Sequence, residues 1–272
     1  MCQECGCGSG GGDVKIGAHS NEHHHGHGHD HEHGHGHHEP GHAHSHAPGI
    51  KTLDLNRSLM EKNALLAERN RGFFRAKNLL VLNVVSSPGS GKTTFIRETA
   101  SRLGASLRVG VIVGDLATDN DAARLRTAGI PVVQITTGTV CHLEADMVSR
   151  AASQLDLDQL DVLVIENVGN LVCPADYDLG EELRVVLLSV TEGEDKPLKY
   201  PPMFHSAHVA IITKSDMASA ASFNRDLALI NLQRVSHHAH IFELSAKTGD
   251  GMKAWLDFLV QQRATAADFN RR

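Results

Sequence analysis

The stretch of sequence that decides the fold reads Ser86-Ser87-Pro88-Gly89-Ser90-Gly91-Lys92-Thr93-Thr94. An apolar run precedes it and a helix-like stretch follows it, which predicts a strand, a glycine-rich turn and a helix N-terminus. Backbone N–H groups in such a turn converge on phosphate oxygens, and the helix dipole favours negative charge. Lys92 is placed to reach the β- and γ-phosphates, and the Thr93 hydroxyl to hold Mg²⁺. We therefore expect nucleotide phosphates on Gly89, Ser90, Gly91, Lys92, Thr93 and Thr94, with Ser86 in the first glycine position of the pattern.

The first fifty residues differ in composition from the rest of this 272-residue chain. They contain clustered glycine and histidine and almost no large apolar side chains, so they cannot bury enough surface to offset chain entropy. We interpret residues 1–50 as a disordered, Cys/His-rich, metal-binding extension. About 220 residues remain, enough for one well-cored α/β domain. These divide into an N-terminal helical segment, 51–78, and a P-loop domain, 79–272.

Charge and hydropathy favour some partners and compartments over others. The formal net charge is -6, and the Lys and Arg residues are scattered rather than clustered, which argues against nucleic acid as the main partner. No run approaches the ~18 apolar residues of a membrane span, and the N-terminus has no apolar signal region. We expect a cytoplasmic protein. Its five cysteines are then more suited to metal ligation or reactivity than to disulfides.

Residues 53–77 have the spacing of a helix that precedes the main domain. Asp54 is a candidate N-cap, and Leu59, Leu66, Phe73 and Phe74 recur near the helical period. The apolar face either braces the sheet or presents leucines to a partner protein, and the sequence leaves both interpretations open.

From residue 79 onward, short runs rich in Val, Ile and Leu alternate with helical stretches. The predicted strands are 79–86, 108–113, 131–136, 161–166, 184–190, 207–213 and 240–244. The predicted helices between them are 93–103, 119–128, 142–155, 221–235 and 250–263. This order is typical of a doubly wound α/β fold with a mostly parallel sheet, whose ligands bind at the carboxyl ends of the strands.

Two segments favour GTP over ATP. Thr213-Lys214-Ser215-Asp216 leaves a predicted strand in the form [NT]-K-x-D, with Thr213 in the position usually held by Asn. The Asp216 carboxylate can accept hydrogen bonds from N1–H and the exocyclic amine of guanine, whereas adenine leaves a buried carboxylate unpaired. Ser245-Ala246-Lys247 follows the last predicted strand and matches the loop whose backbone N–H reads the guanine O6 in GTPases. We expect base contacts from Thr213, Lys214, Asp216, Ser245, Ala246 and Lys247.

Two acids at strand ends complete a predicted hydrolytic site with Lys92 and Thr93. Asp115 is placed to coordinate Mg²⁺ directly or through water. Glu166 opens Glu166-Asn167-Val168-Gly169, an E-x-x-G where many GTPases have D-x-x-G. Its carboxylate is suited to orienting a magnesium-bound or attacking water. Either acid also fits the simpler role of a helix cap.

Cysteine and histidine inside the domain indicate a metal site. Cys141-His142 lies at the start of a predicted helix, whose N-terminus favours the thiolate, and Cys173 lies seven residues after Glu166. Thiolate and imidazole suit Ni²⁺ and Zn²⁺. Water, an acidic side chain or a second subunit would complete the three ligands. A lone buried cysteine is more often a small hydrophobe, so the link to Glu166 carries this interpretation.

The N-terminal extension contains two further metal-binding patterns. Cys2, Cys5 and Cys7 are close enough to chelate one ion, and a free amino group on Cys2 would add a donor that suits Ni²⁺. From His19 to His46, histidine alternates with Gly, Glu, Asp and Ala, which provides many weak imidazole sites. Interleaved acidic residues after a cysteine cluster are atypical of a purification tag.

Together these motifs resemble one family, the hydrogenase nickel-incorporation GTPases of the HypB type. That family belongs to the dimer-forming P-loop class, which includes the urease accessory GTPase. The resemblance covers nearly the whole chain. It rests on the N-terminal Cys-x-x-Cys-Gly-Cys, the His-rich tract, the P-loop, Cys141-His142, Glu166-to-Gly169 with Cys173, and Ser245-Ala246-Lys247.

The resemblance implies a Mg²⁺-dependent, slow GTPase that forms a homodimer with GTP. It also implies delivery of Ni²⁺ to the precursor of the [NiFe]-hydrogenase large subunit. The expected partners are that subunit and a HypA-type nickel/zinc metallochaperone, for which helix 53–77 is a candidate docking surface. Cys141, His142 and Cys173 are implied as a Ni²⁺/Zn²⁺ site at the dimer interface, and Cys2, Cys5 and Cys7 as a tighter Ni²⁺ site. The His tract suggests nickel storage.

Two other functions stay open at this point. The chain is either mainly a nickel storage protein with a vestigial nucleotide domain, or a nickel GTPase whose client is urease. The urease GTPase lacks the N-terminal cysteine cluster, which favours hydrogenase.

Overall fold

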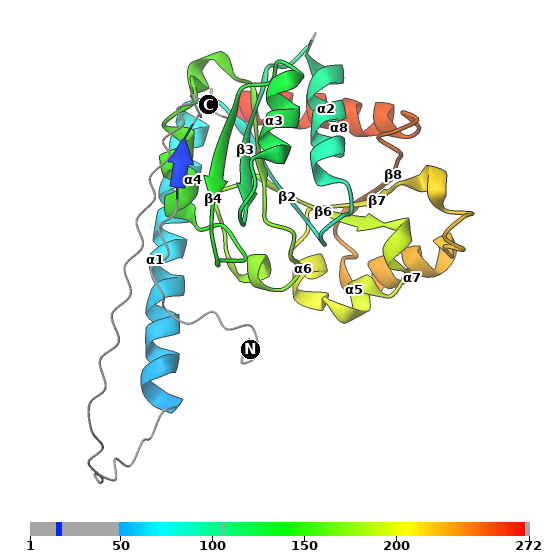
Figure 1. The fold of residues 1–272 in the computed structure, drawn as a ribbon, viewed down its shortest axis with the longest axis horizontal. Helices are drawn as coiled ribbons and strands as arrows, with labels where there is room; N and C mark the ends of the chain where they lie inside the picture. The colour runs from blue at the N-terminus through cyan, green and yellow to red at the C-terminus, as the bar shows by residue number, and fades with distance from the viewer. Residues whose placement is uncertain (1–14, 18–48, 105, 270–272) are drawn as a thin grey trace, which may run out of the picture.

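A computed structural model describes residues 15–17, 49–104 and 106–269 of the chain (Figure 1). Its strands form one eight-stranded sheet in the order β1-β4-β3-β5-β2-β6-β7-β8. They are β1 (Lys15–Gly17), β2 (Leu80–Ser86), β3 (Val109–Asp115), β4 (Val132–Thr136), β5 (Val162–Glu166), β6 (Leu183–Ser189), β7 (Val209–Thr213) and β8 (His240–Glu243). Every neighbouring pair is parallel except β1–β4. The predicted doubly wound, mostly parallel α/β fold is confirmed.

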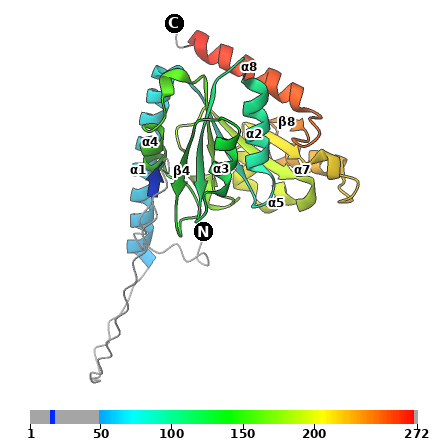
Figure 2. The same ribbon diagram turned by 45° about the horizontal axis from the view of Figure 1, so that its top comes forward.

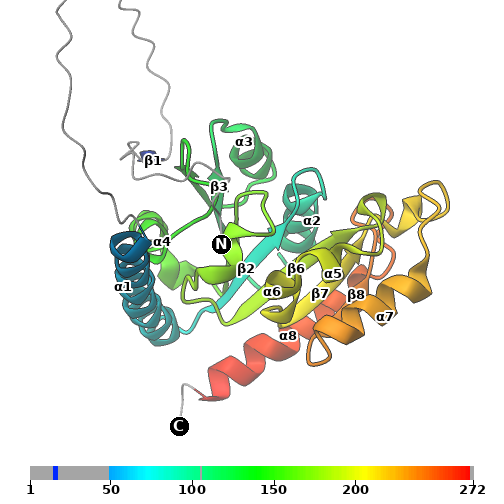
Figure 3. The same ribbon diagram turned by 90° about the horizontal axis from the view of Figure 1, so that it is seen from below.

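Helices cover both faces of the sheet. They are α1 (Gly49–Ala76), α2 (Lys92–Leu103), α3 (Asn120–Thr127), α4 (Ala145–Ala152), α5 (Lys196–Lys199), α6 (Pro201–His205), α7 (Arg225–Val235) and α8 (Met252–Phe269). Apolar residues of α2, α3 and α8 pack on one face, and those of α1, α4, α6 and α7 pack on the other. Figures 2 and 3 show α1 beside α4, and Figure 1 shows the N-terminal part of α1 reaching beyond the sheet.

The residues of β2 alternate between these two faces. Leu80, Leu82 and Val84 pack toward α2 and α8, while Val81 and Val85 pack into two separate clusters on the opposite face. Asn83 lies between Val81 and Val85 on that face and is fully buried. A polar side chain therefore separates two apolar clusters at the centre of the sheet.

The position of β2 in the sheet decides where one connection runs. β5 and β6 are hydrogen-bonded to opposite sides of β2. The connection between them, residues 167–182, therefore crosses β2, and no α-helix forms within it. At its start the Asn167 N–H donates to the Val84 carbonyl, and near its end the Glu182 N–H donates to the Val81 carbonyl.

The structure corrects several details of the predicted elements. β1 falls inside the extension expected to be disordered and pairs antiparallel with the edge of β4. α1 begins at Gly49, so Asp54 lies inside the helix rather than at its N-cap. The helices α5 and α6, of four and five residues, are too short to show a helical period. Cys2, Cys5, Cys7 and the His tract lie outside the described residues. None of the helices described here is long and apolar enough to cross a membrane.

Candidate functional site

The P-loop joins the end of β2 to α2 through two glycines in left-handed conformations, Gly89 (φ 76°) and Gly91 (φ 95°). Side chains larger than glycine are strained there. Ser86 is fully buried, and its Oγ accepts hydrogen bonds from Lys92 Nζ at 3.0 Å and from Ser90 Oγ. The residue that departs from the glycine pattern thus helps hold the loop and its lysine.

Lys92 lies among carboxylates at the carboxyl edge of the sheet. Burial lowers the pKa of its ammonium, and the nearby Glu166, Asp121, Glu192 and Asp115 act in the opposite direction. Asp121 and Glu192 were not predicted as part of the site. Glu192 stands just after β6, so the rule that selected Asp115 and Glu166 could have found it. Burial raises the pKa of Glu192, against a hydrogen bond from Ser87 and the charges of Lys196 and Lys214.

Thr93 and Glu166 meet directly. Thr93 Oγ1 donates to Glu166 Oε1 at 2.7 Å, while Glu166 Oε2 is buried with no hydrogen-bond partner among the residues described. Burial raises the pKa of Glu166 to about 7, against the hydrogen bond from Thr93 and the charge of Lys92. The Thr93 hydroxyl and the Glu166 carboxylate, one oxygen of which is buried and unused, fit a Mg²⁺ ion, which prefers oxygen ligands.

Asp115 ends β3 at the same edge of the sheet, where its register partner on β4 is Thr136. Its carboxylate is engaged by its own turn, because Leu116 N–H donates to Oδ1 at 2.5 Å and Thr118 Oγ1 to Oδ2 at 2.6 Å. The structure therefore brings Asp115 to the site edge but directs its oxygens to local donors.

The segments predicted to read guanine converge beside the P-loop. Thr213 Oγ1 donates to the Ser90 carbonyl at 3.2 Å, and Lys214 Nζ donates to the Gly89 carbonyl at 2.8 Å. Ser245 Oγ donates to Asp216 Oδ1 at 2.7 Å, which joins the two base-reading segments. Ala246 and Lys247 continue the loop from Ser245, and Lys247 is exposed, as is Thr94 on α2. The threonine in place of asparagine still bridges the base segment to the phosphate loop.

We predict that Asp216→Asn exchanges guanine for xanthine selectivity. The amide keeps one acceptor oxygen for N1–H but has an NH2 donor in place of the other, so the exocyclic amine of guanine loses its acceptor and the 2-oxo group of XTP gains a donor. GTP affinity should fall by about 100-fold or more, and XTP affinity should rise. Equilibrium titration with fluorescent GTP and XTP measures both. Asp216→Ala is the control and should weaken GTP without gaining XTP. Unchanged GTP binding in Asp216→Asn would place the base elsewhere.

Cys141, His142 and Cys173 come together at one point. One ligand atom from each lies within 4.8 Å of the others, and the Sγ atoms of the two cysteines, which form no disulfide, are 3.0 Å apart. His142 is buried, and neither ring nitrogen has a hydrogen-bond partner among the described residues. Two thiols and an unused imidazole form a donor set for Zn²⁺ or Ni²⁺.

Neighbouring side chains orient these ligands. The ring of Tyr177 stacks on His142 at a centroid distance of 3.9 Å, and Glu144 Oε1 lies 3.7 Å from His142 Nε2. Asn170 Nδ2 donates to the Cys141 carbonyl at 3.3 Å, which ties the two ligand loops together. The expectation that Cys141 and His142 start a helix is wrong, because α4 begins at Ala145. Glu144, just before α4, is extended (φ −111°, ψ 156°), so the ligands belong to the preceding loop.

The metal ligands and the nucleotide loop share one connection. Residues 167–182 follow Glu166, pass the P-loop and include Cys173. A Cβ atom on Gly169 would lie 3.0 Å from Pro88 Cα, so this connection packs tightly on the P-loop. The P-loop is therefore in direct contact with the segment that holds Cys173.

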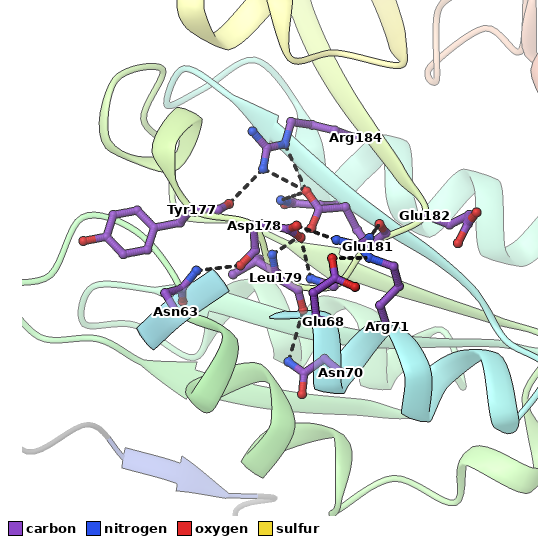
Figure 4. A network of polar contacts seen from close by, with 12 residues as sticks. Asn63, Glu68, Asn70, Arg71, Tyr177, Asp178, Leu179, Glu181, Glu182 and Arg184 are labelled. Atoms are coloured by element: carbon purple, nitrogen blue, oxygen red, sulfur yellow. Dashed lines mark hydrogen bonds and ion pairs between the residues drawn. The ribbon is translucent and has the colours of Figure 1, made fainter. Parts of the chain in front are cut away.

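A buried hydrogen-bond network anchors the same connection further along (Figure 4). Asn167 Nδ2 donates to Asn83 Oδ1 at 3.2 Å, and Asn83 Nδ2 donates to Glu181 Oε1 at 3.0 Å. Arg184 forms an ion pair with Glu181 at 2.9 Å and donates to the Tyr177 carbonyl at 2.8 Å. Burial acts to raise the pKa of Glu181, but the charge of Arg184 and the hydrogen bonds keep that pKa below its ordinary value.

We predict that the nucleotide-free and metal-free protein loses stability as pH rises through 7. The raised pKa of Glu166 means that the folded chain favours the protonated acid. That contribution is complete below the ordinary pKa of 4.5 and is lost as pH rises through about 7. Urea unfolding from about pH 5 to pH 8 should show the wild type falling relative to Glu166→Gln by on the order of 1–3 kcal/mol. A constant difference across this range would mean that the carboxyl ionises normally.

Known proteins resemble this chain in sequence and in fold. The nucleotide-binding domain family CobW/HypB/UreG matches residues 80–243. The hydrogenase maturation factor HypB of Escherichia coli K12 is 49% identical over 220 residues, which cover 80% of this chain and 76% of that protein. The hydrogenase/urease maturation factor HypB of Helicobacter pylori is 41% identical over 217 residues, covering 78% and 89%.

Two solved structures match in fold as well as in sequence. The crystal structure of HypB from Helicobacter pylori in complex with nickel has a TM-score of 0.72 and 42% identity, and covers 75% of this chain and 96% of that one. The crystal structure of HypB from Archaeoglobus fulgidus has a TM-score of 0.70 and 38% identity, with coverage of 75% and 99%. The chain belongs to the CobW/HypB/UreG nucleotide-binding family and, within it, to the HypB hydrogenase maturation factors.

Proposed function

We propose that this chain is a cytoplasmic, Mg²⁺-dependent GTPase that delivers Ni²⁺ to the precursor of the [NiFe]-hydrogenase large subunit. Hydrolysis of GTP gates dimerisation and metal transfer. The proposal is supported by the P-loop and base-reading contacts, and by the Cys141, His142 and Cys173 donor set. The maturation role named for the Escherichia coli relative and the nickel in the Helicobacter pylori structure point the same way.

One observation carries the proposal more than any other. Glu166, which contacts Thr93 of the P-loop, and Cys173, which contacts Cys141, lie at the two ends of one short stretch of chain. Between them Gly169 packs against Pro88. A change at the γ-phosphate can therefore be felt at the thiols, as in switch segments that respond to phosphate. This gives GTP hydrolysis a route to metal affinity.

In the proposed reaction a water attacks the γ-phosphate in line with the leaving GDP oxygen. Lys92 and the N–H groups of the P-loop stabilise the charge that spreads over the phosphate oxygens. Thr93 and Glu166 are the residues that would hold Mg²⁺, which neutralises phosphate charge when bound. Asp115 would orient a metal-bound water once its carboxylate leaves its own turn.

Two features of the chain suggest its protein partners: a metal site with only three ligands among the described residues, and exposed leucines on α1. Three protein ligands leave room for more, so a second subunit would complete the Ni²⁺/Zn²⁺ site in a GTP-dependent homodimer. Leu59 and Leu65 of α1 are 50% and 75% exposed and form the proposed docking surface for a HypA-type metallochaperone. Residues 1–50 would act as the metal-binding extension, with Cys2, Cys5 and Cys7 as a separate Ni²⁺ site and the His tract as nickel storage. The GTPase domain then spans residues 79–272.

Urease is the second candidate client. The name of the Helicobacter pylori relative includes urease, whereas that of the more similar Escherichia coli relative refers to hydrogenase alone. Hydrogenase is therefore the favoured client. A storage role without a GTP switch is the remaining alternative.

A transfer experiment tests the proposal. The full chain, loaded with Ni²⁺, is mixed with the purified large-subunit precursor, and nickel in the precursor is measured by native mass spectrometry. Transfer should be fast with GTP and slow with a non-hydrolysable analogue. Lys92→Ala should retain nickel, because the charge on the γ-phosphate is no longer stabilised.

Two controls separate delivery from storage. Cys141→Ser should remove the GTP-dependent part of transfer while leaving GTP hydrolysis measurable. Nickel transfer at the same rate with GTP as with GDP, and at the same rate for the Cys141→Ser variant as for the wild type, would contradict the proposal and support storage. Transfer to a urease apoprotein in preference to the hydrogenase precursor would change the client.

A further inference from the structure

Two asparagines on α1 connect the two loops that carry the metal ligands. Asn63 Oδ1 accepts the Ala145 N–H at 2.9 Å, and Asn63 Nδ2 donates to the Asp178 carbonyl at 2.8 Å. Asn70 Nδ2 donates to the Ala145 carbonyl at 2.8 Å and to the Leu179 carbonyl at 3.1 Å. Each asparagine therefore holds the first residue of α4, where the Cys141 loop ends, and the connection that contains Cys173. Figure 4 shows the hydrogen bonds to Asp178 and Leu179.

These attachment points lie close to the ligands along the chain. Ala145 is the first residue of α4 and follows His142 by three positions. Asp178 follows Tyr177, whose ring stacks on His142, and belongs to the connection that contains Cys173. The spacing of the two loops at the asparagines therefore limits the spacing of the thiols and the imidazole.

Helix α1 and the connection that contains Cys173 pack closely at the two asparagines. Asn63 and Asn70 are seven residues apart, two turns of helix, and so lie on one face of α1. Gly180 has a φ of 88°, and a Cβ there would lie 2.6 Å from the Ala67 carbonyl oxygen. Asparagine is a poor helix former, so two of them buried in mid-helix cost stability that alanine or leucine would not. Their amides instead satisfy four backbone groups of the two loops.

We propose that Asn63 and Asn70 are positioning residues for the Cys141, His142 and Cys173 site and set its affinity for a divalent metal ion. This inference rests on the proposed function only in treating that site as a metal site. The asparagines act through the backbone of the ligand loops and do not touch the metal. The competing explanation is that they only fasten α1 to the domain.

The test reads the site within the full chain. Cys173 is alkylated with iodoacetamide at buffered concentrations of free Ni²⁺, and its peptide is quantified by mass spectrometry. Because the readout is one peptide, nickel held by the N-terminal cysteines and the His tract does not enter it. GDP affinity and thermal unfolding are measured on the same samples.

Two variants test Asn63 and Asn70 separately. Asn63→Asp retains the acceptor for Ala145 N–H and loses the donor to Asp178, whereas Asn70→Leu removes two bonds at similar volume. The Ni²⁺ concentration for half protection should rise about tenfold in either variant, with GDP affinity unchanged. Arg75 lies on the same helix as the two asparagines and forms a surface ion pair with Glu182, the residue before β6. Arg75→Ala breaks that pair and is the control, which should leave protection unchanged.

The outcomes separate this inference from the proposed function. If both variants protect Cys173 as the wild type does, and only the melting temperature falls, the asparagines are fasteners and the inference is overturned. If Ni²⁺ does not protect wild-type Cys173 at all, the proposed metal site itself fails. Should Asn70→Leu not fold, Asn63→Asp decides the question, because it removes a single donor.

Discussion

The place of β2 between β5 and β6 is the constraint on which the rest of the structure depends. Parallel strands need a connection that returns from one edge of the sheet to the other, and here that connection must cross the strand that carries the P-loop. In most such crossings a helix fills the space. Residues 167–182 form a path with no α-helix instead, so Glu166, which contacts Thr93 of the P-loop, and the Cys173 thiol lie close together along the chain.

That path is fixed by polar contacts in an otherwise apolar interior. An Asn, Glu and Arg network crosses the seam between two apolar clusters on one face of the sheet. A buried ion pair adds little net stability over apolar packing, yet breaking one partner typically costs about 3–5 kcal/mol. Its value here is geometric, because Arg184 donates to the Tyr177 carbonyl and Glu181 accepts the Leu179 N–H, which holds a segment that contains no strand and no α-helix. The asparagines of α1 serve the same loop from its other side.

Sequence reasoning succeeded where a signal repeats along the chain. Alternating apolar strands and helices predicted the sheet, and polar residues just after strands predicted which side chains meet at its edge. The Thr93–Glu166, Ser90–Thr213 and Asp216–Ser245 contacts join segments that had been selected by motif.

It failed where position depends on tertiary contacts. Asn63, Asn70 and Asn83 read as ordinary polar residues in a helix and a strand, because only the folded chain reveals the backbone groups they satisfy. β1 is only three residues long, too short for its sequence to show the alternating pattern of a strand, and it forms by pairing with the edge of β4. The predicted helix begins too early, at residue 142 rather than at Ala145, because no side chain caps the N-terminus of α4 and the sequence carries no strong start signal there. Glu192 is an exception to this limit, since it is an acid just after a strand, as Asp115 and Glu166 are at strand ends, and the same sequence signal predicts it near Lys92.

The central claim is that the nucleotide and the thiols share a mechanical connection. Its most direct test is the Ni²⁺ affinity of wild-type Cys173, read by protection from alkylation, in the presence of GDP and then of a non-hydrolysable GTP analogue. Our account predicts different protection midpoints for the two nucleotides, and a Gly169→Ala variant that brings them together by pushing the segment off Pro88. Identical midpoints in the wild type would contradict it, since the two sites would then be neighbours without coupling.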